Sequence, residues 1–257
     1  MMQLGPIADS RVWRSAGCAI LAIALYLSGA SQTGAADNPF LGPAGAPASS
    51  FPKPDRPVAD IVAPIWHSEK ERDDADEPGQ LVRLLGIKSG TTVADIGAGS
   101  GYLTVRFSPI VGPQGRILAQ DIEPSYLNDL RKRVTTLNLK NVTVGLGEAH
   151  DPRLPQRSVD VAIMVHMYHE ISDPYALLYN LVATFKPGGR LGIVDTPAAT
   201  SRHGTPPALL KCELAAVGYR EIALHSLAGS DTYLAVFTPP APDGRKRPAD
   251  IEACKAE

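Results

Sequence analysis

The amino-acid sequence predicts an α/β fold in which a doubly wound, mostly parallel sheet is covered by helices on both faces. Three observations lead to this prediction. Strand-like segments alternate with helical segments, a glycine-rich turn directly follows the first strand, and the last two strands are joined by the short loop HSLAGSD. Alternation of this kind forms βαβ units with parallel strands, whereas a loop without room for a helix joins antiparallel strands.

The order of apolar and polar residues places each element. Strands are expected at residues 91–96, 116–120, 141–146, 159–165, 190–194, 219–224 and 232–237, and helices at 79–85, 102–111, 126–137, 175–185 and 206–217. Gly86 and Gly218 are expected to end the first and last of these helices, and Thr205 to cap the start of the last. Pro109 is expected to break the helix at 102–111.

Composition excludes several classes of protein. The 257 residues are 44% hydrophobic, carry a formal net charge of −2 and include three cysteines. Without a basic excess, the chain is not built to bind a nucleic-acid backbone. Three cysteines also exclude a disulfide scaffold and a multi-cysteine zinc module. The 23 prolines are more than usual, and eleven of them lie at residues 39–64 and 239–248, near the two ends of the expected domain.

The N-terminal segment has the pattern of an export signal. Two arginines precede an uncharged, apolar run at residues 16–27. This run is too short to span a bilayer, which takes about 20 residues. We expect residues 1–36 to be a signal peptide cleaved after Ala36, with cleavage after Ala30 as the second choice. The protein is then periplasmic or secreted, and the alternative is an uncleaved N-terminal membrane anchor.

The rest of the chain divides into three parts. Residues 37–57 are expected to be a proline-rich linker and residues 241–257 a disordered tail, because neither can bury enough apolar surface to fold alone. Residues 58–240 are expected to form one domain. Cys212 and Cys254 are the cysteines that remain after cleavage. The sequence leaves open whether they form a disulfide.

A glycine-rich turn follows the first strand, at the edge where open α/β sheets bind ligands. Asp95 precedes three glycines at alternate positions, Gly97, Gly99 and Gly101, and a helix follows directly. This spacing allows a tight turn and a close approach of backbone to ligand. An acid beside the turn would repel a pyrophosphate but would tolerate a cationic or zwitterionic ligand.

Further acids follow the next two strands. Asp121 lies 20 residues beyond Gly101, where a carboxylate can accept both hydroxyls of a ribose. Glu148 follows the third strand and is expected at the rim of the same site. Together with the glycine turn, these acids predict a pocket for a nucleoside with cationic character.

This pattern resembles that of the class I S-adenosylmethionine-dependent methyltransferases. The segment VADIGAGSGY at residues 93–102 is similar to the family's first motif, and matches continue through residues 158–163 and 186–191. The resemblance covers residues 81–237 and is nearest to an exported, uncharacterised branch. It implies a Rossmann-like sheet of seven strands with an antiparallel last strand, and S-adenosylmethionine as cofactor. It also implies a cofactor site formed by Asp95, Gly97, Gly99, Gly101, Tyr102, Asp121, Ile122 and Glu148.

Candidates for the chemistry follow the fourth strand. Methyl transfer depends mainly on orientation, and a base helps only when the acceptor carries a proton. We expect His166 to act as that base, Tyr168 to contact the acceptor or the methyl group, and His169 to join the site. The alternative is that Tyr168 and His169 only begin the next helix. No metal is expected, because His166, His169 and Glu170 lack the spacing of an open metal site.

Three other features border the expected site. Asp195 ends the fifth strand and is expected at the same rim, whereas His203 is expected to be solvated. The charged stretch at residues 67–77 either covers the site or forms a solvated helix face. The segment at 196–205 is shorter than the lids of class I enzymes for small substrates, so the resemblance does not define the acceptor pocket.

The sequence therefore predicts a methyltransferase that acts on an unidentified small-molecule acceptor. No nucleic-acid partner is expected, and membrane contact is expected only through an uncleaved N-terminus. One alternative is a catalytically inactive, cofactor-binding envelope protein, because S-adenosylmethionine is made in the cytoplasm. A second is a nicotinamide oxidoreductase, which would also use a glycine-rich turn.

Overall fold

A seven-stranded sheet forms the centre of the computed structural model, which describes residues 39–61 and 69–255. The strands run in the order β3-β2-β1-β4-β5-β7-β6. They are β1 (Thr92–Ile96), β2 (Arg116–Asp121), β3 (Val142–Leu146), β4 (Val159–Val165), β5 (Phe185–Asp195), β6 (Arg220–Ser226) and β7 (Tyr233–Thr238). The helices are α1 (Glu69–Asp74), α2 (Glu77–Leu85), α3 (Tyr102–Val111), α4 (Pro124–Thr136), α5 (Pro174–Val182) and α6 (Pro207–Val217).

The strand directions confirm the predicted fold class. Strands β1 to β5 pair in parallel, and β7 is antiparallel to both of its neighbours, β5 and β6. Two local predictions were wrong. Pro109 lies inside α3 without breaking it, because it removes a single backbone hydrogen bond and α3 ends two residues later, at Val111. Thr205 does not cap α6, since its hydroxyl donates to Asp195 instead.

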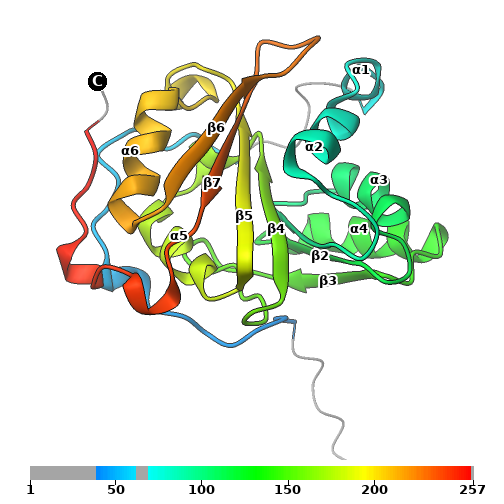
Figure 1. Ribbon diagram of the computed structural model, residues 1–257, viewed down its shortest axis with the longest axis horizontal. Helices are drawn as coiled ribbons and strands as arrows, with labels where there is room; N and C mark the ends of the chain where they lie inside the picture. The colour runs from blue at the N-terminus through cyan, green and yellow to red at the C-terminus, as the bar shows by residue number, and fades with distance from the viewer. Residues whose placement is uncertain (1–38, 62–68, 256–257) are drawn as a thin grey trace, which may run out of the picture. The chain divides into compact units, whose positions relative to one another are not determined.

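Helices cover both faces of the sheet, as Figure 1 shows, with α5 and α6 on one side and α2, α3 and α4 on the other. The strands supply alternating residues to two cores, because successive side chains of a strand point to opposite faces. Val93 and Ile117 pack toward α3, whereas Ala94 and Leu118 pack toward α5. Central strands that are buried on both faces consist almost entirely of apolar residues, which explains the apolar runs in the sequence.

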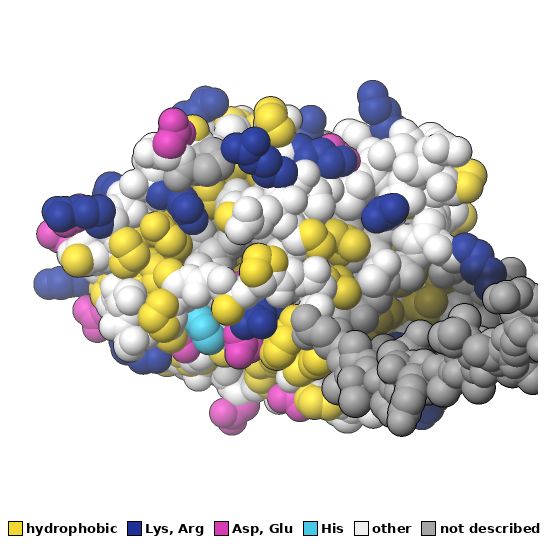
Figure 2. All heavy atoms as spheres, turned by 90° about the horizontal axis from the view of Figure 1, so that it is seen from below, with side chains coloured by type: hydrophobic (Ala, Val, Ile, Leu, Met, Phe, Trp, Pro, Cys, Tyr) yellow, Lys and Arg dark blue, Asp and Glu magenta, His cyan; other side chains and the backbone are white. Residues whose placement is uncertain are grey.

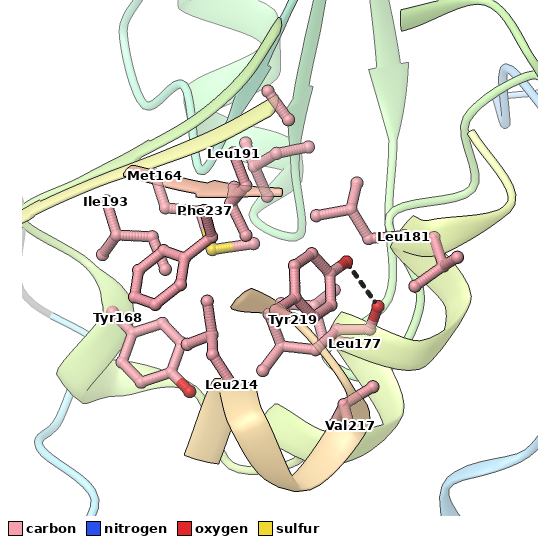
Figure 3. Close-up of a cluster of buried hydrophobic side chains, with 14 of the residues drawn as sticks. Met164, Tyr168, Leu177, Leu181, Leu191, Ile193, Leu214, Val217, Tyr219 and Phe237 are labelled. Atoms are coloured by element: carbon pink, nitrogen blue, oxygen red, sulfur yellow. Dashed lines mark hydrogen bonds between the residues drawn. The ribbon is translucent and has the colours of Figure 1, made fainter. Parts of the chain in front are cut away.

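The core beneath α5 and α6 contains several aromatic side chains (Figure 3). Tyr219 donates its hydroxyl to the backbone carbonyl of Leu178 at 2.9 Å, as the dashed line shows. Tyr168 lies in the same cluster near Phe237, and its hydroxyl points toward α6. The polar end of each tyrosine is therefore satisfied within the core, as burial requires.

The predicted linker and tail are both packed against the domain, which corrects two expectations. In Figure 1, the N-terminal segment (blue) and the C-terminal segment (red) run along the side of the molecule that carries α5 and α6. Phe51 and Arg56 are buried, and so are Ile251 and Cys254. A β-bridge joins Asp55 to Lys255. A proline-rich segment needs no core of its own when a few anchoring side chains enter an existing one.

A disulfide between Cys212 of α6 and Cys254 fixes the C-terminal segment, and the two cysteines are 42 positions apart in the sequence. We predict that the Cys212→Ser, Cys254→Ser double variant loses about 2–4 kcal/mol of unfolding free energy, because the open chain gains entropy when unfolded. Urea denaturation with and without reductant measures this loss. Reductant should destabilise the wild type only, and an equal effect on the double variant would contradict the assignment.

The predicted signal peptide at residues 1–36 lies outside the described residues. Within the parts that the structure describes, no helix combines the length and the apolar character of a bilayer span. Figure 2 shows one face of the molecule, on which Lys and Arg side chains are interspersed with apolar, neutral and acidic ones.

Candidate cofactor and acceptor site

A cavity of about 540 Å³ opens at the carboxyl ends of β1, β2, β4 and β5. Its volume lies within the usual range of about 300–1,000 Å³ for small-molecule sites. One end is lined by the glycine turn, Asp121, Ile122 and Glu148. The other end is lined by the segment after β4 and by residues that follow β5. We call these parts the cofactor end and the acceptor end.

The glycine turn adopts backbone conformations that favour glycine. Gly97, Gly99 and Gly101 have φ angles of +68°, +53° and +89°. A Cβ on Gly99 would meet no atom of the protein within 4 Å, so this position leaves open space on the cavity side for a ligand. A Cβ on Gly101 would lie 2.3 Å from Cδ1 of Leu130. Gly97 and Gly99 line the cavity, whereas Gly101 permits the close packing of α3 on α4.

Asp121 lies at the end of β2, buried beneath the cofactor end. Its carboxylate accepts the backbone N–H of Gly99 at 2.8 Å and that of Glu123 at 2.9 Å. Burial raises the pKa of Asp121, and these backbone hydrogen bonds partly offset the rise. Each oxygen retains a second lone pair, so the carboxylate can still accept two ribose hydroxyls.

Asp95 does not line the cavity, which corrects its predicted direct contact with the cofactor. Its buried carboxylate accepts a hydrogen bond from Thr104 of α3 at 2.7 Å, so that it joins β1 to the helix behind the glycine turn. Burial raises the pKa of Asp95 to about 6, although the hydrogen bond from Thr104 and the charge of Arg72 oppose the rise.

The raised pKa of Asp95 predicts a pH-dependent stability. The pKa of Asp95 is higher in the folded protein than in the unfolded chain, because burial disfavours the charged carboxylate. Its contribution to the free energy of unfolding is therefore fully present at low pH and is lost as the pH rises through about 6. Between about pH 4.5 and pH 7.5, we expect Asp95→Asn to gain about 2 kcal/mol relative to the wild type. Urea denaturation across this range measures the difference. Asp129→Asn, on exposed α4, should follow the wild-type curve, and a parallel Asp95→Asn curve would refute the prediction.

Ile122 and Glu148 both line the cofactor end, where the sequence predicted them. Glu148 is partly exposed and lies 3.2 Å from Arg153. Tyr102 also lines the cavity, but its hydroxyl donates to Asp73 of α1 at 3.0 Å. The guanidinium groups of Arg72 and Arg106 lie over its ring at 3.7 and 3.8 Å from the centroid.

This cluster shows what the charged stretch at residues 67–77 does, as far as it is described. Helix α1 binds α3 and α4 through ion pairs, in which Glu69 contacts Arg106 and Arg133. Arg72 reaches the cavity itself. The described part of the stretch, from Glu69 onward, therefore borders the site, and it is not simply a solvated helix face.

His166 follows β4 and lines the cavity next to the glycine turn. Its Nε2 lies 3.0 Å from Oε2 of Glu77, a buried residue of α2. Arg72 donates to the other carboxylate oxygen of Glu77 at 2.9 Å. Burial alone would raise the pKa of Glu77, but the hydrogen bond with His166 and the charge of Arg72 hold it below its usual value. Glu77 is thus an anion that orients the His166 ring.

His169 is buried and lines the acceptor end. Its Nδ1 lies 3.0 Å from Oδ1 of Asp195, the last residue of β5. Asp195 is fully buried and accepts two more hydrogen bonds, from the hydroxyl of Thr205 at 2.7 Å and the backbone N–H of Thr196 at 2.8 Å. Asp195 therefore holds His169 from behind. The sequence had predicted Asp195 at the rim of the site, but it does not line the cavity.

Tyr168 lies away from the cavity, which corrects its predicted role at the methyl group. The side chain is fully buried, and its hydroxyl donates to Glu213 of α6 at 2.8 Å. Residues 168–170 form a short 3-10 turn, so that His169 and Tyr168 point in different directions. The sequence alternative, in which Tyr168 only packs at the start of the next element, describes this residue correctly.

The sequence did not single out Glu77, Arg72 or His203 for the site. Glu77 and Arg72 lie in a charged run, where surface residues are the usual expectation, and no local pattern marks them. His203 was expected to be solvated, but it is half-buried and lines the acceptor end beside His169. Its ring meets that of His169 edge-on, with 5.5 Å between the centroids.

The fold and the site together define a class I S-adenosylmethionine-dependent methyltransferase. The open space at Gly99, the buried carboxylate of Asp121 and the apolar Ile122 suit its nucleoside cofactor. A family model described as a methyltransferase domain matches residues 87–215, half of the sequence, and the chain belongs to this family.

Relatives with similar sequences agree with this assignment, and a solved structure shares the fold. The chain is 32% identical over 115 residues to the ubiquinone/menaquinone biosynthesis C-methyltransferase UbiE of Saccharophagus degradans, covering 44% of this chain and 46% of that one. It is 27% identical over 161 residues to the UbiE of Pseudomonas savastanoi, covering 58% and 63%. The chain thus spans less than two thirds of these relatives. A SAM-dependent methyltransferase from Aquifex aeolicus shares the fold, with a TM-score of 0.60, 24% identity, and coverage of 68% of this chain and all of that one.

Proposed function

We propose that this protein transfers a methyl group from S-adenosylmethionine to a small molecule bound at the acceptor end. One observation carries the proposal: the glycine turn and Asp121 share a single cavity with two carboxylate-oriented histidines, His166 and His169. A protein that only bound the cofactor would have no need of oriented histidines at the acceptor end. The cofactor would supply a methyl group on a positively charged sulfur, which an acceptor displaces in line.

The cofactor end would bind and orient this group. Asp121 would accept both ribose hydroxyls, Ile122 would pack against the adenine, and Glu148 would approach the adenine amino group. The backbone at Gly97 and Gly99 would come close to the ligand because neither residue has a side chain. Orientation of this kind accounts for much of the rate enhancement in a displacement reaction.

His166 would take the proton of an acceptor hydroxyl. Glu77 accepts a hydrogen bond from Nε2–H of His166, which leaves a lone pair on Nδ1. The anionic Glu77 also stabilises the imidazolium that forms when Nδ1 takes a proton. The proton then passes from Nδ1 to solvent, which returns His166 to its starting state.

The acceptor is proposed to be a small, partly apolar ring compound with a hydroxyl group. The cavity is lined by the apolar side chains of Ile171 and Leu177 next to polar ones, among them Ser172 and Thr196. The relatives are named for quinone biosynthesis, which supports a ring acceptor.

Two measurements test the proposal. Isothermal titration with S-adenosylhomocysteine should show one bound equivalent, and no binding at millimolar ligand would refute the cofactor assignment. Mass spectrometry should then detect S-adenosylhomocysteine formed from S-adenosylmethionine with a panel of quinols and phenols. Cofactor binding without turnover on any acceptor would favour the inactive, cofactor-binding alternative, and binding of NAD instead would favour an oxidoreductase.

We also propose that the protein acts outside the cytoplasm, in the periplasm or after secretion. The N-terminal apolar run supports export, and so does the Cys212–Cys254 disulfide, because disulfides persist in oxidising compartments. A periplasm-dependent reporter fused after the domain should be active with the full N-terminus and inactive when residues 1–36 are deleted. Equal reporter activity in the two fusions would contradict export through this segment.

A further inference from the structure

We propose that His169, Glu170 and His203 form a binding site for a divalent transition-metal ion at the acceptor end of the cavity. Each residue offers one ligand atom, and these atoms all lie within 4.8 Å of one another. All three residues line the cavity. His169 and Glu170 come from the turn after β4, whereas His203 follows β5, so the fold brings together residues that are distant in sequence.

The spacing suits a shared ion better than a direct contact. Nε2 of His169 lies 3.9 Å from Oε1 of Glu170, which is too long for a hydrogen bond between them. Two ligands that are each about 2.0–2.2 Å from one metal ion lie about 3–4 Å apart. Small side-chain rotations of His203 would bring the third ligand to the same ion.

A second observation, independent of this spacing, comes from the residues behind His169. Asp195 binds Nδ1 of His169 at 3.0 Å and is itself held by Thr205 at 2.7 Å. Because the carboxylate of Asp195 accepts a hydrogen bond from Nδ1–H of His169, the lone pair of the ring lies on Nε2, on the side of Glu170. Histidines that bind metals almost always donate their other N–H to a carboxylate or carbonyl in this way. The carboxylates of Asp195, which is buried, and Glu170, which is half-buried, also give the site a negative potential.

The ligand set indicates the class of ion. Two imidazoles and one carboxylate suit Zn²⁺ or Fe²⁺. An ion that prefers thiolates would find none among the described residues, because Cys212 and Cys254 are joined in a disulfide. Three protein ligands leave at least one coordination position open toward the cavity.

The role of the ion rests on the proposed function, although its binding does not. At the open position, the ion would hold the acceptor through a hydroxyl oxygen and lower the pKa of that hydroxyl. The O–H bond breaks and its proton goes to His166, while the oxygen forms the new bond to the methyl carbon. The sulfur–methyl bond breaks at the same time, its electron pair stays on the sulfur, and S-adenosylhomocysteine leaves. Acceptors with an oxygen that binds metal, such as phenols or enols, would therefore be preferred.

Metal binding is tested on the full chain without any acceptor. After treatment with a chelator and dialysis, we expect the wild type to bind one equivalent of Zn²⁺ by elemental analysis and by titration, and Co²⁺ to give the visible absorption of a histidine-bound ion. His203→Ala should bind Zn²⁺ at least about 100-fold more weakly, and Asp195→Asn about 10–100-fold more weakly. His225→Ala on β6, outside the cavity lining, is the matched control and should bind as the wild type does.

S-adenosylhomocysteine binding separates this proposal from the proposed function. His203→Ala should retain that binding, since His203 lies at the acceptor end, and retained binding also shows that the variant is folded. If the wild type binds less than one equivalent of Zn²⁺, or if His203→Ala binds as tightly as the wild type, the metal site is refuted. If the wild type does not bind S-adenosylhomocysteine, the proposed function is refuted instead.

Discussion

Replacement of Asp121 by alanine is expected to weaken S-adenosylhomocysteine binding by at least about 100-fold. Hydrogen bonds to a charged group contribute about 1.5–3 kcal/mol each, and two ribose hydroxyls would lose their acceptor. The variant also removes the acceptor for the N–H groups of Gly99 and Glu123, which loosens the glycine turn itself. Isothermal titration measures the change in Kd.

Asp121→Asn separates these two effects. The amide has a similar shape but only one acceptor oxygen. Its NH₂ group must therefore face an N–H or O–H group that donates a hydrogen bond to the carboxylate in the wild type. We expect an intermediate loss of affinity for this variant. Asp129→Asn removes a carboxylate from the exposed surface of α4 and should bind as the wild type does. Circular dichroism should show folded protein throughout, and unchanged affinity in folded Asp121→Ala would refute the assigned role of Asp121.

Most of the fold could be predicted because its signals are local. Buried strands appear as short apolar runs, and helices appear as segments with an apolar stripe. Gly86 and Gly218 mark the ends of two of these helices, α2 and α6. The antiparallel pair β6 and β7 followed from the short loop between them. The flanking segments were misjudged because each is held by a few long-range contacts, such as Arg56 with α6, which leave no periodic pattern in the sequence.

The site was predictable to the extent that strand ends determine it. Asp121, Ile122, Glu148 and His166 all end a strand or follow one within two residues, and all of them line the cavity. Glu77 could not be found in this way, because it begins α2, a helix that precedes the first strand, and contacts His166 only in the folded protein. Tyr168 and His169 point in different directions because they lie in a 3-10 turn. Residue types alone do not predict which of two neighbouring side chains in such a turn faces the cavity.

The ion pair of Arg56 and Glu213 joins the N-terminal segment to α6 in the protein interior. Nε of Arg56 donates to Glu213 at 2.8 Å, and both side chains are fully buried. The remaining donors of Arg56 reach the carbonyls of Tyr168 and His169 at 3.4 Å. Tyr168 donates to the second carboxylate oxygen of Glu213. This network therefore also holds the turn that carries His169.

We expect Glu213→Ala to lose about 3–5 kcal/mol of unfolding free energy, because it leaves the guanidinium of Arg56 buried without a counter-charge. The double variant Arg56→Met, Glu213→Leu should recover much of that loss, since two apolar side chains of similar volume need no partner. Urea denaturation of Arg56→Met, of Glu213→Leu and of the double variant gives the coupling between the two positions.

The exposed pair of Lys211 and Glu221, which also involves α6, is the matched control. Lys211→Ala should change the unfolding free energy by less than about 1 kcal/mol, because solvent already screens that pair. A loss of stability in Glu213→Ala no larger than that in Lys211→Ala would mean that Arg56 does not depend on Glu213 as its counter-charge. The ion pair would then not hold the N-terminal segment on the domain. If the double variant recovers stability but loses turnover, then the carbonyl contacts of Arg56 position the turn at residues 168–170 for the acceptor.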